Sequence, residues 1–205
     1  MDGGVATTPP LGGGALRRTV RLVALLNLGY FGIEFAVAPA IGSVALFADS
    51  IDFLEDASLN LLILLALGWS ALFRARLARA LALLILVPGL ATLWTAWEKF
   101  SLPVPPDPVP LSLAGAGAFA VNLACALLLA RFRVDGNSLT RTAFLSARND
   151  VLANVAIVAA GVTTAFLWQS AWPDLLVGLA IAGVNADSAW EVWEAASSEG
   201  SAAPA

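Results

Sequence analysis

Apolar residues dominate six stretches of the chain, and short polar or proline-rich segments separate them. Each stretch has roughly 20 residues or more, which is the length that an α-helix needs to cross a hydrocarbon core of about 30 Å. The sequence therefore predicts an all-α bundle of six membrane-spanning helices. The predicted spans are Val20–Ile41, Val44–Ala71, Leu77–Trp97, Leu111–Ala130, Ala143–Trp168 and Trp172–Trp193.

Three of the predicted spans carry polar residues at helical intervals. Residues three or four positions apart share one face of a helix, so each set forms a polar stripe. A carboxylate at the centre of a membrane helix costs about 2.5 to 3.5 kcal/mol, so such acids usually face a bundle interior, an ion or a proton path. The stripes are Asn27, Tyr30 and Glu34 in the first span, Asp49, Asp52, Asp56 and Asn60 in the second, and Ser146, Asp150 and Asn154 in the fifth.

The ends of the chain differ from this pattern. Residues 1–16 are rich in Gly, Ala and Pro and resemble no signal peptide, so we expect a disordered N-terminal tail. Residues 17–193 form the predicted six-span transmembrane domain, and 194–205 a short C-terminal tail. Within these limits no stretch is suited to a second, soluble domain.

Composition indicates the class of protein and narrows its chemistry. The 205 residues are 59% hydrophobic and 13% charged, whereas soluble domains carry about 25% charged residues. There is no histidine and one cysteine, Cys125, which excludes an internal disulfide and a cysteine-built zinc site. Oxygen donors remain as metal ligands. The net charge of −4 argues against nucleic-acid binding, and no residue set suggests an enzyme or a resident cofactor.

Basic residues predict the orientation in the membrane. Nine of the eleven flank the spans on one side, which the positive-inside rule assigns to the cytoplasm. Both termini are then cytoplasmic, and the protein is expected to be a multi-pass protein of the cell membrane, the inner membrane in a bacterium. The nine are Arg17, Arg18, Arg21, Arg74, Arg76, Arg79, Arg131, Arg133 and Arg141.

Spacing within the stripes predicts a cation site. Side chains at i and i+4 lie about 5 to 6 Å apart, so one pair from each of two facing helices can converge on one ion. Asp52 and Asp56 supply one pair, and Ser146 and Asp150 supply the other. A bound cation offsets the repulsion between carboxylates, and protons take its place when it leaves. Alternate exposure of such a site to the two sides gives cation/proton antiport.

Each of these residues also has a structural interpretation. The aspartates can form a polar contact that only holds helices together, and Ser146 can bond a carbonyl of its own helix. Asp49 is either an outer entrance or proton site, or a cap near the membrane surface. Glu34 is either a proton carrier or a packing partner. Asn149 and Asn154 are further accessory ligand candidates, Asn149 being the replacement if Ser146 is no ligand.

Three segments resemble the cation diffusion facilitators. The run YFGIEFAVAPAIGSVALFADSIDFLEDASLN is similar to the first two spans of that family, and it places Asp52 and Asp56 on a metal-binding [HD]-x-x-x-D motif. The run AFLSARNDVLANVAIVAAG is similar to the fifth span, with Asp150 on the family aspartate and Ser146 on the family histidine. WPDLLVGLAIAG is similar to the start of the sixth span. The resemblance implies a divalent-cation exporter that works as a homodimer.

Two departures from the family qualify this expectation. Family members usually continue into a soluble metal-binding domain that helps them dimerise, and we expect that domain to be missing here. A serine at the histidine position leaves three carboxylates and hydroxyl or amide oxygens, which favour harder ions such as Mn²⁺ over Zn²⁺. Zn, Mn, Co and Fe all remain candidate substrates.

The sequence therefore favours a transporter that exports a divalent cation from the cytoplasm in exchange for protons, and two other functions stay open. A passive cation or proton channel would use the same polar stripes. A membrane scaffold subunit would use the acids only to hold its helices together.

Overall fold

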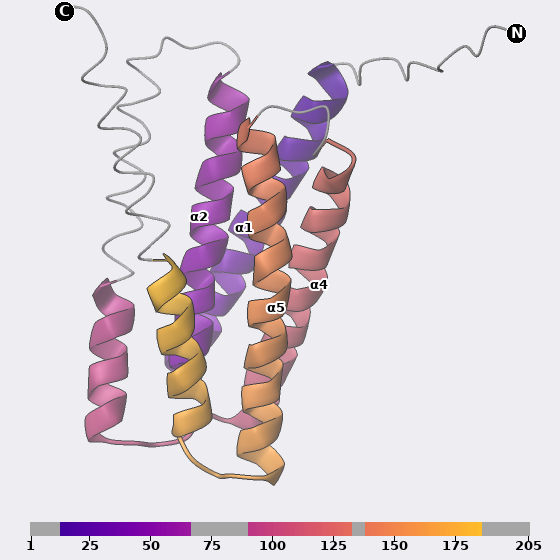
Figure 1. The fold of residues 1–205 in the computed structure, drawn as a ribbon. Coiled ribbons are helices and arrows are strands. Elements are labelled where there is room, and N and C mark those ends of the chain that lie inside the picture. Colours follow the sequence, from indigo (N-terminus) through magenta and orange to yellow (C-terminus); the bar gives the residue numbers. More distant parts are fainter. Residues whose placement is uncertain (1–12, 67–89, 133–137, 186–205) are drawn as a thin grey trace, which may run out of the picture.

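The computed structural model describes residues 13–66, 90–132 and 138–185, and these residues form six helical segments (Figure 1). Two of the segments are short helices, at 90–101 and at Trp172–Asn185. The four long helices are α1 (Gly13–Ile41), α2 (Val44–Ala66), α4 (Pro108–Ala130) and α5 (Ser138–Phe166).

Helix boundaries agree closely with the hydropathy pattern where the structure describes them. The predicted ends at Ile41 and Ala130 and the predicted start at Val44 coincide with the ends of α1 and α4 and the start of α2. Helix α1 begins at Gly13, inside the segment predicted as a disordered tail. The rest of that tail, the C-terminal tail and the first part of the third span lie outside the described residues.

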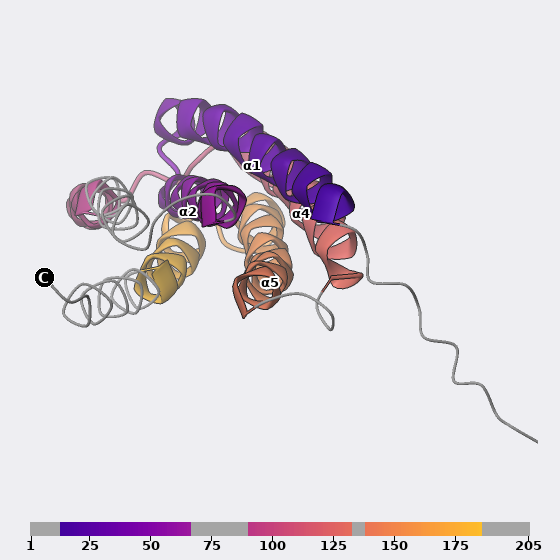
Figure 2. The same ribbon diagram turned by 90° about the horizontal axis from the view of Figure 1, so that it is seen from above.

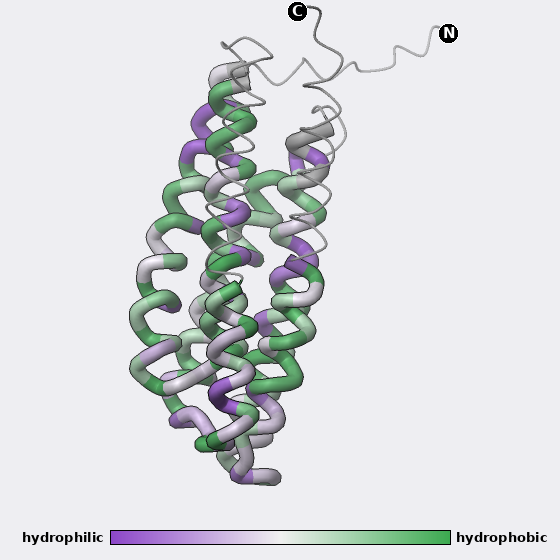
Figure 3. Tube along the Cα trace, turned by 90° about the vertical axis from the view of Figure 1, so that its left-hand side faces the viewer, coloured by the Kyte–Doolittle hydropathy of each residue, from purple (hydrophilic) through white to green (hydrophobic). Residues whose placement is uncertain are grey.

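Within the part of the chain that the structure describes, three helices are long and apolar enough to cross a membrane, namely Gly14–Ile41, Pro108–Ala130 and Ala143–Phe166. Helix α2 has the required length, but four acidic residues interrupt its apolar run. The hydropathy colouring in Figure 3 shows the same pattern: hydrophobic residues follow all the drawn helices, and hydrophilic residues interrupt them.

The long helices pack as a bundle, in which α1 pairs with α2 and α4 pairs with α5 (Figure 2). Helix 90–101 and helix Trp172–Asn185 lie on the α2 side of this bundle. The turns that follow α1, helix 90–101 and α5 all lie at the lower end in Figure 1.

Local sequence explains the tight turn between α1 and α2. Gly42 has φ of 65°, a left-handed conformation that glycine adopts without strain. The amide of Ser43 donates to the Ala38 carbonyl at 2.9 Å, and the amide of Gly42 donates to the Pro39 carbonyl at 3.3 Å. These two bonds form a Schellman motif, which ends α1 and lets α2 begin within three residues.

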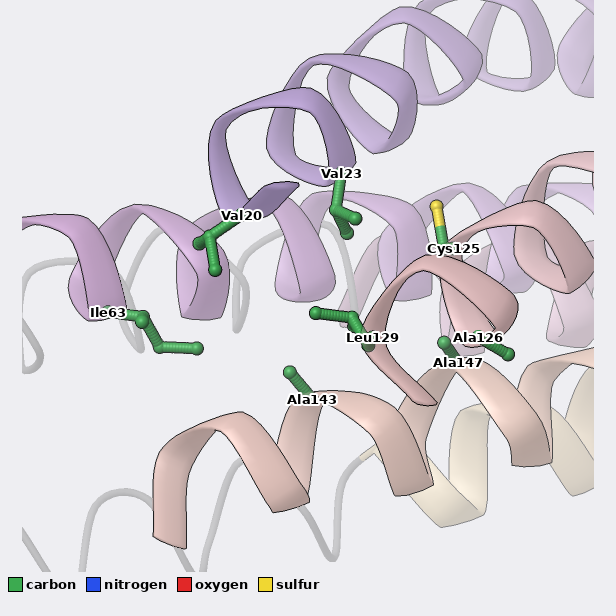
Figure 4. Close-up of a cluster of buried hydrophobic side chains, with 8 residues drawn as sticks. All are labelled: Val20, Val23, Ile63, Cys125, Ala126, Leu129, Ala143 and Ala147. Atoms are coloured by element: carbon green, nitrogen blue, oxygen red, sulfur yellow. The ribbon is translucent and has the colours of Figure 1, made fainter. Parts of the chain in front are cut away.

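Two apolar clusters fill the interior at different heights. The first contains Val20, Val23, Ile63, Cys125, Ala126, Leu129, Ala143 and Ala147 (Figure 4). The second contains Ala38, Ala45, Leu46, Ala48, Leu111, Ala114, Ile157 and Ile181. Along the four long helices, buried and half-buried polar residues fall between these two clusters, and Ser146 lies beside Ala147 of the first cluster. We call this zone the polar layer; it comprises Asn27, Glu34, Asp49, Asp52, Asp56, Asn60, Asn122, Ser146, Asp150 and Asn154.

Candidate functional site

Asp56 connects three helices within the polar layer. Its Oδ1 accepts a hydrogen bond from the Ser146 hydroxyl of α5 at 2.8 Å, and its Oδ2 accepts one from Asn27 Nδ2 of α1 at 3.4 Å. Asn60 Nδ2, one turn further along α2, donates to the Asp56 carbonyl at 2.8 Å. A buried carboxylate needs such donors, because they replace the hydrogen bonds to water that it loses on burial. The Ser146 hydroxyl therefore points at Asp56 and not at its own backbone.

Asp150 and Asp52 complete the predicted ligand set and lie next to Asp56. The carboxyl groups of Asp150 and Asp56 are within hydrogen-bonding reach of each other. Asp52 is half-buried, and its electrostatic neighbours include Asp150 and Asp56. Two carboxyl groups at this range need a proton or a cation between them, because neither has a hydrogen to donate when ionised. The structure thus brings Ser146 and Asp150 of α5 to Asp56 of α2, and Asp52 lies one turn before Asp56 on α2.

A second set of polar contacts surrounds Asp49. Asn154 Nδ2 donates to Asp49 Oδ2 at 2.7 Å, and Asn122 Nδ2 donates to Asn154 Oδ1 at 3.0 Å. The three residues come from α2, α5 and α4, and all are buried. Because the Asn154 amide is held from both sides, its donor face toward Asp49 is fixed. Asp49 is therefore no cap at a membrane surface, which was one of its two interpretations.

Glu34 is fully buried, yet neither of its carboxyl oxygens accepts a hydrogen bond from the residues that the structure describes. It faces Asp49, with the two carboxyl groups within hydrogen-bonding reach, and the second oxygen of Asp49 also has no described donor. Tyr30, one turn away on α1, donates instead to the Ala114 carbonyl at 2.6 Å. The Glu34–Asp49 pair therefore also requires a proton or a cation.

The remaining polar residues differ in whether they lie at the polar layer. Asn149 is exposed and accepts a bond from Arg148 Nη2 at 3.3 Å, so the structure does not bring it to the polar layer. Asn27 and Asn122 belong to the polar layer, although the sequence pattern gave them no site role. Cys125 of the first apolar cluster contacts the layer by donating from Sγ to Asn27 Oδ1 at 3.5 Å. Asn27 was recognisable as the first member of the α1 stripe.

The polar layer does not form a ready-made coordination shell. Among the described residues, no three His, Cys, Asp or Glu side chains are grouped so that they hold a metal ion. Asp56 is instead engaged by Ser146 and Asn27, and Asp49 by Asn154. A cation that binds here must replace some of these hydrogen bonds with metal–oxygen bonds.

A family model of the cation efflux transmembrane domain matches residues 75–199. The chain belongs to this family. The matched segment includes α4, α5 and both short helices, and with them Ser146 and Asp150, whereas α1 and α2 precede it. A comparison with curated proteins finds no significant match.

Family membership and the apolar helices together identify a multi-pass, all-α membrane protein that transports metal cations. The resemblance to the cation diffusion facilitators that we drew from sequence is thereby confirmed. Members of this family are transporters rather than enzymes, as the composition had suggested.

Proposed function

We propose that this protein exports a divalent cation from the cytoplasm in exchange for protons. The observation that carries the proposal is the contact of Ser146 of α5 with Asp56 of α2 at 2.8 Å inside the bundle, with Asp150 and Asp52 each one turn away on the same two helices. These residues are the ligand set of the proposal, with Asn154, Asp49 and Glu34 as accessory groups. The oxygen donors suit Mn²⁺ as well as Zn²⁺, Co²⁺ or Fe²⁺.

The layer supports exchange because the same carboxyl pairs can be neutralised in two ways. The Asp56–Asp150 pair and the Glu34–Asp49 pair each need one positive charge between them, from a proton or from a metal ion. A metal ion that enters must displace protons from carboxylates to use them as ligands. Glu34 and Asp49 lie beside the ligand set, where they can take up and release protons during the cycle.

Apolar clusters on both sides of the polar layer favour a transporter over an open channel. A channel needs a continuous polar path, whereas here apolar side chains of all four long helices pack above and below the layer. The bundle must rearrange before an ion can pass either cluster, which is the requirement of alternating access. We further propose that the protein works as a homodimer with both termini in the cytoplasm, and that it resides in the cell membrane, in a bacterium the inner membrane.

The first prediction concerns metal-dependent proton flux in proteoliposomes. Wild type should move Mn²⁺ or Zn²⁺ in one direction and protons in the other, and Asp56→Asn should lose both fluxes because it removes a central ligand charge. Glu98→Gln is the matched control, since the Glu98 side chain is exposed and accepts a hydrogen bond from Trp94 of the same helix.

The same measurement distinguishes the proposed exporter from a passive channel and from a scaffold subunit. Cation flux without any proton movement would indicate a channel. If wild type moves neither ion, the acids serve only to hold the helices together, and the proposed function is wrong.

A further inference from the structure

A buried ion pair lies away from the polar layer, at the lower end of the bundle in Figure 1. Lys99 Nζ, at the end of helix 90–101, is 2.8 Å from Asp174 Oδ2, at the start of helix Trp172–Asn185. Both side chains are almost completely buried. The Lys99 ammonium also donates to the Gly42 carbonyl in the turn between α1 and α2. The pair therefore joins three separate parts of the chain.

Asp174 also caps α2, although it belongs to another helix. The amides of Val44 and Ala45 donate to its two carboxylate oxygens, at 2.9 and 3.2 Å, and the Ser43 hydroxyl donates to it at 2.5 Å. The Ser43 Oγ in turn accepts from the amide of Leu46 at 3.1 Å. The first amides of a helix have no partner within it, and a negative charge at that end is favourable. We call Gly42, Ser43, Val44, Ala45, Lys99 and Asp174 the Lys99–Asp174 junction.

Contacts beyond the junction extend the same connection along α2. A Cβ placed on Gly178 would come within 2.8 Å of the Ala45 amide nitrogen, so the backbones of helix Trp172–Asn185 and α2 are in close contact there. Three residues further along the helix, Ile181 packs in the apolar cluster with Leu46 and Ala48. Asn185 Nδ2 then donates to the Ala48 carbonyl at 3.4 Å. Ala48 directly precedes Asp49, the first carboxylate of the polar layer.

Helix 90–101 is attached to the same group. Ala96 packs with Val44, Ala171 and Leu175 in a small apolar cluster, and the rings of Phe100 and Trp172 meet edge to face at 5.6 Å. The start of α2 thus contacts the two short helices through an ion pair, hydrogen bonds from its backbone amides and apolar packing. Further along α2, Asp56 contacts α5 through a hydrogen bond from the Ser146 side chain.

We propose that Lys99 and Asp174 are positioning residues for transport, which hold the start of α2 against the two short helices. This inference rests on the proposed function. The junction stays closed during the cycle, so that the carboxylates of α2 keep their register. Opening the junction would leave a buried carboxylate, a buried ammonium and the first amides of α2 unpaired, which makes it unsuited to open in every cycle.

Cation dependence of transport tests this role in the full chain in proteoliposomes, with Mn²⁺ or Zn²⁺. Asp174→Asn and Lys99→Met should raise the half-saturating cation concentration about 10-fold, the low end of the effect of removing a direct partner of a metal ligand, because the pair holds the start of α2 one turn before Asp49. Lys99→Arg keeps the charge and should retain much more of the affinity. Asp107→Asn is the matched control, because Asp107 caps α4 at the same end of the bundle through the Val109 amide at 3.0 Å.

A cross-link tests whether the junction stays closed. Lys99→Cys and Asp174→Cys in a Cys125→Ser background can be joined by a short bifunctional thiol reagent. We expect cross-linked protein to transport at least as well as the same variant before cross-linking. Transport that stops on cross-linking and returns on cleavage would show a gate that must open, and would overturn the proposal.

Two outcomes separate this proposal from the proposed function. If wild type transports and Asp174→Asn has the same cation affinity as Asp107→Asn, the junction has no positioning role. If wild type itself does not transport, the proposed function fails, and amide hydrogen exchange then tests the junction alone. Asp174→Asn should speed exchange at Val44 and Ala45, and unchanged protection of these amides would refute the junction.

Discussion

Single side chains decide whether the polar layer is a cation site, and Ser146 is the most informative of them. Its hydroxyl bonds Asp56 at 2.8 Å, so it lies on the side of α5 that faces the candidate ligands. A hydroxyl that donates to a carboxylate can turn its oxygen toward a metal ion once the ion takes the place of that hydrogen bond. Ser146 is therefore positioned to act either as a ligand or as a donor that orients Asp56.

Substitution of Ser146 separates these roles. Ser146→His places an imidazole beside three carboxylates, and we expect the preference to shift from Mn²⁺ toward Zn²⁺, because nitrogen donors favour Zn²⁺. Ser146→Ala should weaken cation binding without this shift. Competition between Zn²⁺ and Mn²⁺ in transport measures both effects, with Thr95→Ala as control, since Thr95 bonds the Ala91 carbonyl of its own helix. An unchanged preference in all variants would remove Ser146 from the site.

Spacing alone predicted which residues share a helix face, and it predicted less about what each side chain contacts. The stripes containing Asp56, Asp150 and Asn154 do face the interior. The partners of Asn122 and Cys125 depend on how α4 packs against α1 and α5, which a single helix pattern does not contain. Asn149 is adjacent to Asp150, but the helical rotation of about 100° per residue turns it to the exposed side.

At the scale of helices, hydropathy predicted the ends of α1 and α4 and the starts of α2 and helix Trp172–Asn185, because the membrane sets the approximate length of a span. Helices α1 and α5 begin seven and five residues before their predicted starts. The contacts between distant helices had a weaker signal. Lys99 is the single lysine of the chain, and it lies in a segment predicted to face away from the nine arginines. Asp174 lies in the neighbouring turn on that same side. Glu98 and Asp107 lie on that side as well, so the sequence did not predict which acid pairs with Lys99, nor the bonds of Asp174 to the start of α2.

Close packing of helix Trp172–Asn185 on α2 gives a prediction about stability. Gly178→Ala should destabilise the protein by about 1–3 kcal/mol, because the added Cβ would meet the Val44 and Ala45 backbone at 2.8 Å and force the helices apart. Gly183→Ala in the same helix is the control, since a Cβ there meets nothing within 4 Å. Chemical unfolding in detergent measures both.

The comparison between these two glycines also tests the helix contact itself. Gly183→Ala should be neutral or slightly stabilising, because alanine favours helix more than glycine does. Equal effects of the two substitutions would mean that the tight contact between helix Trp172–Asn185 and α2 does not contribute to stability.

At the scale of the whole molecule, the polar layer is enclosed by apolar clusters on both sides and is linked to one end by the Lys99–Asp174 junction. Charged and polar groups in such an enclosure cannot exchange freely with water, so any cation that enters must be matched by the loss of other positive charge. The layer contains five carboxyl groups in close electrostatic contact, from Glu34, Asp49, Asp52, Asp56 and Asp150.

We therefore expect metal binding in the enclosed polar layer to be coupled to the release of protons. Calorimetry measures this release. Binding of Mn²⁺ or Zn²⁺ to the detergent-solubilised protein should release protons, because the metal displaces them from carboxyl pairs such as Asp56 and Asp150. The observed enthalpy should then vary with the ionisation enthalpy of the buffer. Since protons compete for the same oxygens, the apparent affinity should weaken as the pH falls.

Asp150→Asn removes one member of the pair and should reduce the number of protons released, while Glu98→Gln should not change it. An enthalpy independent of the buffer at every pH would contradict the exchange of protons for the cation, even if the cation binds in the polar layer.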